Sequence, residues 1–193
     1  MSLSVHDKTH HTYGEYLTWS DEQRYELIEG VAYAMTPSPS RTHQRIVGEL
    51  FRQIADALEE GTCEVNIAPL DVRLPEEGES DDAIVTVVQP DVFVVCDPGK
   101  LDERGCRGAP DWVIEVISPQ SAAHDQIRKL ATYERHGVKE YWLVHLIDRI
   151  VFVYCLEGGR YARPSLHELK GPLSSATVPG VNIDWDRALR HLP

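Results

Sequence analysis

Residues 89–96 read Gln-Pro-Asp-Val-Phe-Val-Val-Cys, and residues 111–117 read Asp-Trp-Val-Ile-Glu-Val-Ile. Each segment is an apolar, β-branched run, which predicts a buried strand. Asp91 stands directly before the first run and Glu115 stands inside the second. A basic helix carrying Lys129 is predicted over residues 125–136, followed by another apolar run at 140–146. This strand–helix–strand order predicts an α/β fold with a mixed sheet.

A carboxylate inside an apolar strand is costly to bury unless it is paired or binds a cation. Asp91 and Glu115 on neighbouring strands form a suitable oxygen donor pair for Mg²⁺. Such a cation activates a water and neutralises charge on a phosphate oxygen. In the alternative interpretation, Asp91 caps a loop and Glu115 pairs with an arginine. We favour the functional interpretation for Glu115 and leave both open for Asp91.

Two further charged residues near these strands each have two interpretations. Asp111 lies two pleats before Glu115 and shares its face, so it is a candidate third ligand or supporting acceptor. Its place after Pro110 suits a loop cap equally well, and we favour that structural role slightly. Lys129 fits an ordinary i,i+4 surface pair with Asp125. In a cleft beside a metal, the same ammonium would orient a water and stabilise a charged phosphate. The sequence alone does not decide whether Lys129 lies on the surface or in such a cleft.

The rest of the sequence predicts further strands, a loop and a second long helix. A hairpin is predicted at residues 25–35, a strand at 63–74, a solvated acidic loop at 75–82 and a hairpin after residue 146. Residues 42–60 have the apolar spacing of a helix. At 100° per residue His43 falls on the buried face of this helix and Glu49 on the opposite, solvent face. Glu49 is therefore left out of the candidate site. Short strands and a last helical turn are expected after residue 156.

The composition is that of an ordinary globular protein, with 42% hydrophobic and 26% charged residues in a chain of 193. We expect one domain over residues 13–193, after a disordered or loosely attached segment at 1–12. No apolar stretch approaches the ~20 residues that span a bilayer. The first residues show no secretory pattern either, so we expect a cytoplasmic protein without membrane contact.

The net charge bears on binding to nucleic acid, and the cysteines and histidines bear on disulfides and metal sites. Nineteen basic and thirty-one acidic residues give 19 − 31 = −12, which opposes non-specific attraction to nucleic acid. Binding to DNA would therefore need a local basic surface or the metal. The four cysteines, Cys63, Cys96, Cys106 and Cys155, form no CxxC pair, and we expect buried free thiols. His43, His124, His136 and His145 show no metal-ligand spacing.

Taken together, these segments resemble the Uma-two family of the PD-(D/E)XK nuclease superfamily, whose members are labelled restriction endonucleases. The resemblance implies a restriction-endonuclease-like mixed sheet flanked by helices, with an added N-terminal hairpin. It also implies Mg²⁺ or Mn²⁺ bound by Asp91 and Glu115, and hydrolysis of DNA phosphodiester bonds. The superfamily lysine would stand at residue 117, which is isoleucine, and the resemblance points to Lys129 instead. The matching residues are Tyr25–Gly30, His43, Gln89–Asp91, Gly108–Asp111, Ile114–Val116, Ser118–Pro119, Lys129, Tyr133 and Gly137–Trp142.

A metal-dependent nuclease with Asp91, Glu115 and Lys129 as catalytic residues is thus the leading hypothesis. The alternative is a non-catalytic interaction or regulatory module that keeps the fold, which the charge of −12 favours. A metal-dependent enzyme acting on a smaller phosphoester would use the same residues. The position of Lys129 discriminates the first two, because a nuclease needs it to face both carboxylates. The oligomeric state is left open; a homodimer is common in the fold that the resemblance implies, and exposed strands after residue 145 could serve as its interface.

Overall fold

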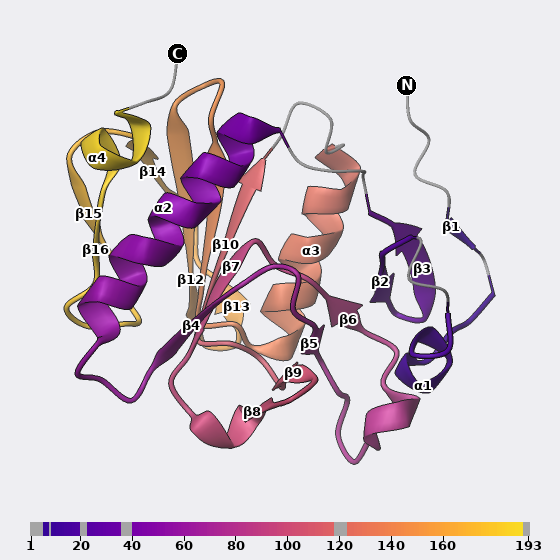
Figure 1. Ribbon diagram of the computed structural model, residues 1–193. Helices are drawn as coiled ribbons and strands as arrows, with labels where there is room; N and C mark the ends of the chain where they lie inside the picture. The colour runs from indigo at the N-terminus through magenta and orange to yellow at the C-terminus, as the bar shows by residue number, and fades with distance from the viewer. Residues whose placement is uncertain (1–5, 8, 20–22, 36–39, 118–122, 191–193) are drawn as a thin grey trace.

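The computed structural model describes residues 6–7, 9–19, 23–35, 40–117 and 123–190 (Figure 1). Its main sheet has the order β13-β12-β11-β10-β7-β4, and β14 also pairs with β12. Only β10 and β11 run parallel, so the sheet is mixed as predicted. The strands are β4 (Glu64–Ile67), β7 (Val92–Val95), β10 (Trp112–Ile117), β11 (Glu140–His145), β12 (Ile150–Glu157), β13 (Arg160–Tyr161) and β14 (Ser165–Glu168).

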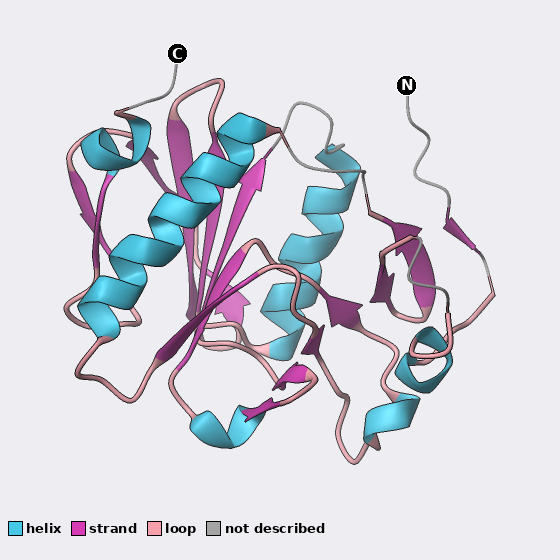
Figure 2. Ribbon diagram, in the orientation of Figure 1, coloured by secondary structure: helices cyan, strands magenta, loops and turns pink. Residues whose placement is uncertain are grey.

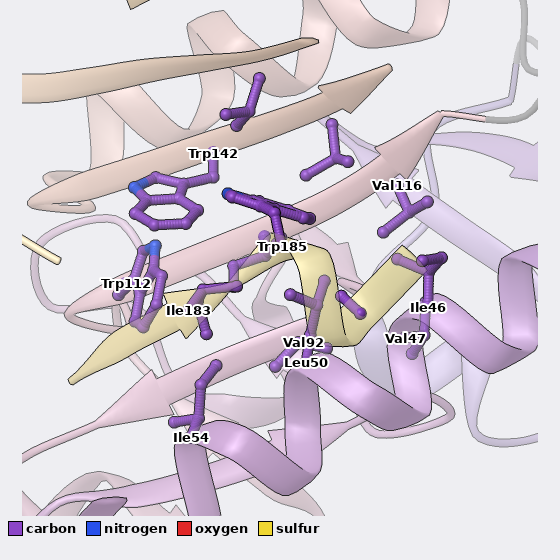
Figure 3. Close-up of a cluster of buried hydrophobic side chains, with 14 of the residues drawn as sticks. Ile46, Val47, Leu50, Ile54, Val92, Trp112, Val116, Trp142, Ile183 and Trp185 are labelled. Carbon is purple, nitrogen blue, oxygen red and sulfur yellow. The ribbon is translucent and has the colours of Figure 1, made fainter. Parts of the chain in front are cut away.

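Helix α2 (Arg41–Leu58) covers one face of this sheet, because its apolar stripe meets the even-numbered side chains of β7 and β10 (Figure 3). Three tryptophans, Trp112, Trp142 and Trp185, are fully buried in this layer. Trp185 begins α4 (Trp185–Leu189), which packs beside the hairpin of β15 (Pro172–Ser174) and β16 (Asn182–Asp184). The C-terminal segment therefore completes the core on the α2 side.

Helix α3 (Ala123–His136) covers the opposite face, where Tyr133 and Leu130 pack against the odd-numbered side chains of β7 and β10. The two helices thus enclose the sheet between them (Figure 2). In a strand, successive side chains point to opposite faces, so odd-numbered residues of β10 such as Glu115 face α3. This alternation places one carboxylate inside the layer between sheet and helix.

A second sheet packs next to the α3 layer in the order β1-β3-β2-β6-β5-β9-β8. Its hairpin turns at Glu29 and Gly30, whose φ angles of 52° and 78° suit a tight left-handed turn. The predicted N-terminal hairpin is therefore confirmed. The elements are β1 (His6–Asp7), α1 (Tyr13–Tyr16), β2 (Tyr25–Ile28), β3 (Val31–Ala34), β5 (Val72–Arg73), η1 (Asp81–Ala83), β6 (Val87–Val88), η2 (Pro98–Lys100), β8 (Leu101–Asp102) and β9 (Gly105–Arg107).

Three expectations from the sequence need comment. The single strand at 63–74 is wrong, because β4 and β5 belong to different sheets and a cis Ala68–Pro69 bond lies between them. The acidic loop after β5 is only partly solvated, since Asp81 pairs with buried Arg73 at 2.8 Å. In the segment expected to be loosely attached, β1 pairs with β3, and residues 1–5 and 8 lie outside the described part.

The expectation of four free thiols is wrong for two of them. Glu64 pairs with Val95 across β4 and β7, so the preceding and following cysteines, Cys63 and Cys96, face each other and form a disulfide. Register of this kind is a long-range property that the spacing of the cysteines does not reveal. Cys106 and Cys155 are free. Within the described part of the chain, no helix has the length and apolar composition needed to cross a bilayer.

Candidate active site

The register of the main sheet brings Asp91 and Glu115 together. Trp112 pairs with Val94 and Ile114 with Val92 across the antiparallel strands β10 and β7. Continuing this register by one residue sets Asp91 opposite Glu115, at the point where β7 begins. Side chains at such opposed positions lie within about 6 Å of one another at their Cβ atoms. The convergence of two carboxylates expected from the sequence therefore follows from the strand pairing.

Asp91 is held by one of its two carboxylate oxygens. Oδ2 accepts a hydrogen bond from the backbone N–H of Val116 at 2.8 Å and lies 3.1 Å from Nε2 of His43. His43 is buried as predicted, in the first turn of α2, where the Ser40 hydroxyl accepts from its backbone N–H. Burial lowers the pKa of His43, but the hydrogen bond and charge of Asp91 outweigh burial and raise it above its ordinary value. These contacts fix Asp91, and no hydrogen bond to its Oδ1 comes from the described residues.

Glu115 is held in the same one-sided way. Its Oε1 accepts hydrogen bonds from Nζ of Lys129 at 2.9 Å and from the hydroxyl of Tyr133 at 2.8 Å, both from α3. The pKa of Glu115 is raised to about 7, because burial and the charges of Asp91 and Glu26 together outweigh the lowering effect of Lys129. Burial lowers the pKa of Lys129, but Glu115 and Glu26 outweigh this and raise it above its ordinary value. Lys129 therefore remains a cation.

A third carboxylate reaches the same lysine from the second sheet. Glu26 of β2 is buried, and its Oε1 lies 2.8 Å from Nζ of Lys129. The same oxygen accepts the backbone N–H of Gln89, the residue that precedes Pro90 and Asp91, at 2.8 Å. Lys129 is 15% exposed and lies between two carboxylates, so its ammonium faces the strand acids and not bulk solvent. The side chain of Asp125, its alternative surface partner, lies outside the described residues.

Sequence reasoning proposed Asp91, Glu115 and Lys129 as site residues but assigned no role to Glu26, His43 or Tyr133. The burial of His43 was predicted from the helical projection, while its contact with Asp91 was not. Glu26 lies in a short strand beside an apolar residue, a pattern equally typical of a solvent-facing acid. The one signal that could have found it was its place in the stretch Tyr25–Gly30 that carries the family resemblance.

The site carries an excess of negative charge. With every group ionised and His43 neutral, Glu26, Asp91 and Glu115 contribute −3 and Lys129 contributes +1, which gives a formal charge of −3 + 1 = −2. Among the described residues, no donor contacts Oδ1 of Asp91 or Oε2 of Glu115. No group of three or more His, Cys, Asp and Glu side chains in the described ranges is arranged to hold a metal. A divalent cation here would therefore rely on these two carboxylates together with water, which is a common arrangement for Mg²⁺.

Asp111 and Glu49 lie outside this cluster. Asp111 accepts the backbone N–H of Cys96 at 2.7 Å and the ammonium of Lys139 at 2.7 Å, at the opposite end of β10 from Glu115. Its role is therefore structural. Glu49 faces away from the site, as the projection predicted, but it is covered rather than solvated. Its carboxylate is 20% exposed and pairs with Arg52 and with Arg187 of α4.

Asp111→Asn is expected to lower the free energy of unfolding by about 1–2 kcal/mol at neutral pH, because charge-assisted hydrogen bonds are lost. Burial raises the pKa of Asp111, but Lys139 and the Cys96 N–H outweigh it, so the folded-state pKa is below the ordinary 3.8. The stabilisation is present above the unfolded-state pKa and disappears as the pH falls through the folded-state pKa. Urea unfolding should show that the free energies of unfolding of variant and wild type differ less at pH 3 than at pH 7. An equal difference at the two pH values would contradict this account.

Comparisons with known proteins bear on the fold and on the family of this chain. A crystal structure from Anabaena variabilis, titled a "putative nuclease belonging to DUF820", superposes with a TM-score of 0.72 at 19% identity, over 93% of this chain and 97% of that one. At this identity the likeness concerns the fold, and it confirms the nuclease-like architecture. An uncharacterized protein of Synechocystis, slr1290, is 29% identical over 132 residues. That match covers 67% of this chain and 65% of the relative, just under two thirds of its length.

The strongest comparison spans nearly the whole chain. The model of the Uma2 family, described as "Putative restriction endonuclease", matches residues 13–186. This range includes every residue of the cluster around Lys129, from the hairpin glutamate to the two strand carboxylates. The chain belongs to the Uma2 family.

Proposed function

We propose that this protein is a divalent-metal-dependent endonuclease that hydrolyses phosphodiester bonds of DNA. The observation that carries the proposal is the largely covered cluster of Glu26, Asp91, Glu115 and Lys129, whose formal charge with every group ionised is −2. A cluster with excess negative charge, in which two carboxylate oxygens have no partner among the described residues, is costly without a cation. The family description and the nuclease-like fold support the same conclusion.

Asp91 and Glu115 are the residues that would hold Mg²⁺ or Mn²⁺. Both are hard oxygen donors, and each has one oxygen fixed by the protein and one without a described partner. Bound there, the metal would supply a water of lowered pKa and a Lewis acid for the phosphate oxygens. The contacts of His43 and the Val116 N–H hold Asp91 in one orientation. Those of Lys129 and Tyr133 do the same for Glu115.

Lys129 is the group suited to act on the reacting phosphate or water. An ammonium has three N–H donors, and two of them are directed at Glu26 and Glu115. The third remains to orient the attacking water or to stabilise negative charge on the phosphate. This position differs from that expected of a non-catalytic module, in which Lys129 would point to bulk solvent. We therefore favour the enzyme over the module.

Glu115→Gln is expected to abolish binding of Mg²⁺ or Mn²⁺ in calorimetry and metal-dependent cleavage of mixed DNA in the same buffers. At a metal concentration of ten times Kd, binding should stabilise the wild type by about 1.4 kcal/mol. That corresponds to a rise in Tm of roughly 3–5 °C for a chain of this size. The variant should show no rise, because the amide removes the charge that the cation needs.

Glu103→Gln provides the control, since Glu103 is an exposed carboxylate in the loop after β8. It should bind metal and cleave DNA like the wild type. A wild type that binds neither metal at millimolar concentration would end the proposal. Metal binding without cleavage of DNA, together with hydrolysis of a small phosphoester, would redirect it to that smaller substrate.

A further inference from the structure

Two of the connections between the sheets lie beside the candidate site. Residues 68–71 lead from β4 of the main sheet to β5 of the second sheet, and residues 89–91 lead from β6 of the second sheet to β7 of the main sheet. The backbone N–H of Ala68 in the first connection donates to the carbonyl oxygen of Asp91 in the second at 3.2 Å. The two sheets that supply the carboxylates of the cluster are therefore joined directly at the site.

The side chains of Asp71 and Gln89 link the same two connections, and we call these two residues the inter-sheet pair. The amide Nε2 of Gln89 donates to Oδ1 of Asp71 at 2.9 Å, and the hydroxyl of Tyr13 donates to Oδ2 of Asp71 at 3.1 Å. The amide oxygen of Gln89 accepts from Arg24 at 3.4 Å. Gln89 is only 7% exposed. Because a buried amide is costly without hydrogen bonds, these partners fix its orientation.

The inter-sheet pair reaches the candidate site through the backbone of Gln89. Its N–H donates to Oε1 of Glu26 at 2.8 Å, and the same oxygen lies 2.8 Å from Nζ of Lys129. Nζ of Lys129 lies in turn 2.9 Å from Oε1 of Glu115. A continuous series of contacts, each 2.9 Å or shorter, therefore leads from Asp71 in one connection to Glu115 in the main sheet.

We propose that Asp71 and Gln89 are positioning residues, which hold Glu26 and through it the ammonium of Lys129 against the strand carboxylates. The inference rests on the proposed function, and it makes the second sheet part of the catalytic arrangement. A reacting group that is misplaced by about 1 Å can lose ~10²-fold in rate. Partners that hold a site residue without touching the reactants typically change activity about 10–100-fold. A purely structural pair would instead affect only the stability of the fold.

The test reverses the direction of the hydrogen bond between the two side chains. Gln89→Glu sets two carboxylates against each other, whereas Gln89→Glu combined with Asp71→Asn restores one donor and one acceptor. Single-turnover cleavage at saturating Mg²⁺ should fall about 10-fold in the single variant and return close to the wild-type rate in the double variant. The Kd for Mg²⁺ should stay at the wild-type value in both. In a Lys129→Met background, Gln89→Glu should cause no further loss, because it acts through Lys129.

Gln53→Glu is the matched control. Gln53 is a second buried glutamine, and its Nε2 also donates to a carboxylate, that of Glu49, at 3.1 Å. It lies on α2 ten residues after His43, which is ~15 Å along the helix. Gln53→Glu and Gln89→Glu should both lower Tm in EDTA, by about 2–6 °C, because each creates a pair of like charges. Only Gln89→Glu should lower the rate of cleavage at 20 °C.

Labelling of lysine amines by a succinimidyl ester, at 20 °C in EDTA, measures the position of Lys129 without any cleavage. Lys129 is 15% exposed and paired with two carboxylates, and Lys139, at 63% exposed, is the internal standard. The labelling of Lys129 relative to Lys139 should rise severalfold in Gln89→Glu. It should return to the wild-type ratio in the double variant, and it should stay at that ratio in Gln53→Glu.

These measurements separate the inter-sheet pair from the nuclease. Equal labelling ratios in wild type, single and double variants would overturn the role of the pair, whether or not the protein cleaves DNA. The expected ratios in a protein that does not cleave DNA would refute the nuclease alone. Wild-type cleavage by Gln89→Glu, or a 10-fold loss that persists in the Lys129→Met background, would refute the positioning role alone.

Discussion

Lys129→Met should reduce DNA cleavage by about 10²–10³-fold, the loss typical of removing one preorganised donor from a charged transition state. This corresponds to about 3–4 kcal/mol in the activation free energy. The ammonium lies 2.9 Å from Glu115 and 2.8 Å from Glu26, and methionine keeps the length of the side chain without its charge. The measurement is single-turnover cleavage at saturating Mg²⁺, together with the urea midpoint of the metal-free protein.

Two further variants separate catalysis from folding. Removing one partner of a buried ion pair costs about 3–5 kcal/mol, so Lys129→Met is also expected to be less stable. Lys129→Arg keeps the positive charge between the carboxylates and should fold normally, but its planar fork places the donors differently and activity should stay low. Lys139→Met is the control, because Lys139 pairs with Asp111 at the other end of β10 and its side chain is 63% exposed. This variant should keep the wild-type cleavage activity. Near wild-type cleavage by Lys129→Met would remove this residue from the reaction.

The sequence predicted the parts of this fold that depend on local periodicity. The strands around Asp91 and Glu115, the helix with His43 on its inner face and the N-terminal hairpin all follow from spacings of two or about 3.6 residues. The cost of burying Glu115 also pointed to the site before any geometry was available. Lys129 was different, because helical projection left it on a face that was either solvent or a cleft wall.

What the sequence did not reveal depends on contacts between distant segments. Glu26 reaches Lys129 across more than a hundred residues, and it does so only because the second sheet packs beside α3. The same holds for the disulfide, since the register of β4 against β7 sets Cys63 opposite Cys96. The break of residues 63–74 into two strands has a similar origin, because each half pairs with a different sheet.

The carboxylates of Glu115 and Glu140, on the parallel strands β10 and β11, differ in how their oxygens are partnered. Among the described residues, Glu115 has donors on one oxygen only, and two other acids lie nearby. Glu140 is fully buried, and both of its oxygens are satisfied. Its Oε1 accepts from Trp142 Nε1 at 2.6 Å and the Ala176 N–H at 3.2 Å. Its Oε2 accepts from the Ser175 hydroxyl at 2.7 Å and the Thr177 N–H at 2.8 Å. Glu140 thus needs no cation and anchors the C-terminal segment.

Glu140→Gln is therefore expected to lower the free energy of unfolding by about 3 kcal/mol, more than the other carboxylate-to-amide substitutions considered above. Charge-assisted hydrogen bonds contribute about 1.5–3 kcal/mol each, and the amide NH₂ would face N–H donors that have no other acceptor. For a chain of this length, the expected fall in Tm is about 6–12 °C. Calorimetric unfolding in EDTA measures it without interference from metal binding.

Metal binding by the same variant at 20 °C should match the wild type, because Glu140 opens β11 opposite Trp112, at the other end of β10 from Glu115. Glu157→Gln, an exposed carboxylate at the end of the adjacent strand β12, should change stability by less than about 0.5 kcal/mol. Ser175→Ala removes one of the four donors and should cost about 1 kcal/mol. If Glu140→Gln unfolds at the wild-type temperature, the C-terminal segment is held by its apolar contacts with α2 and Trp142 alone.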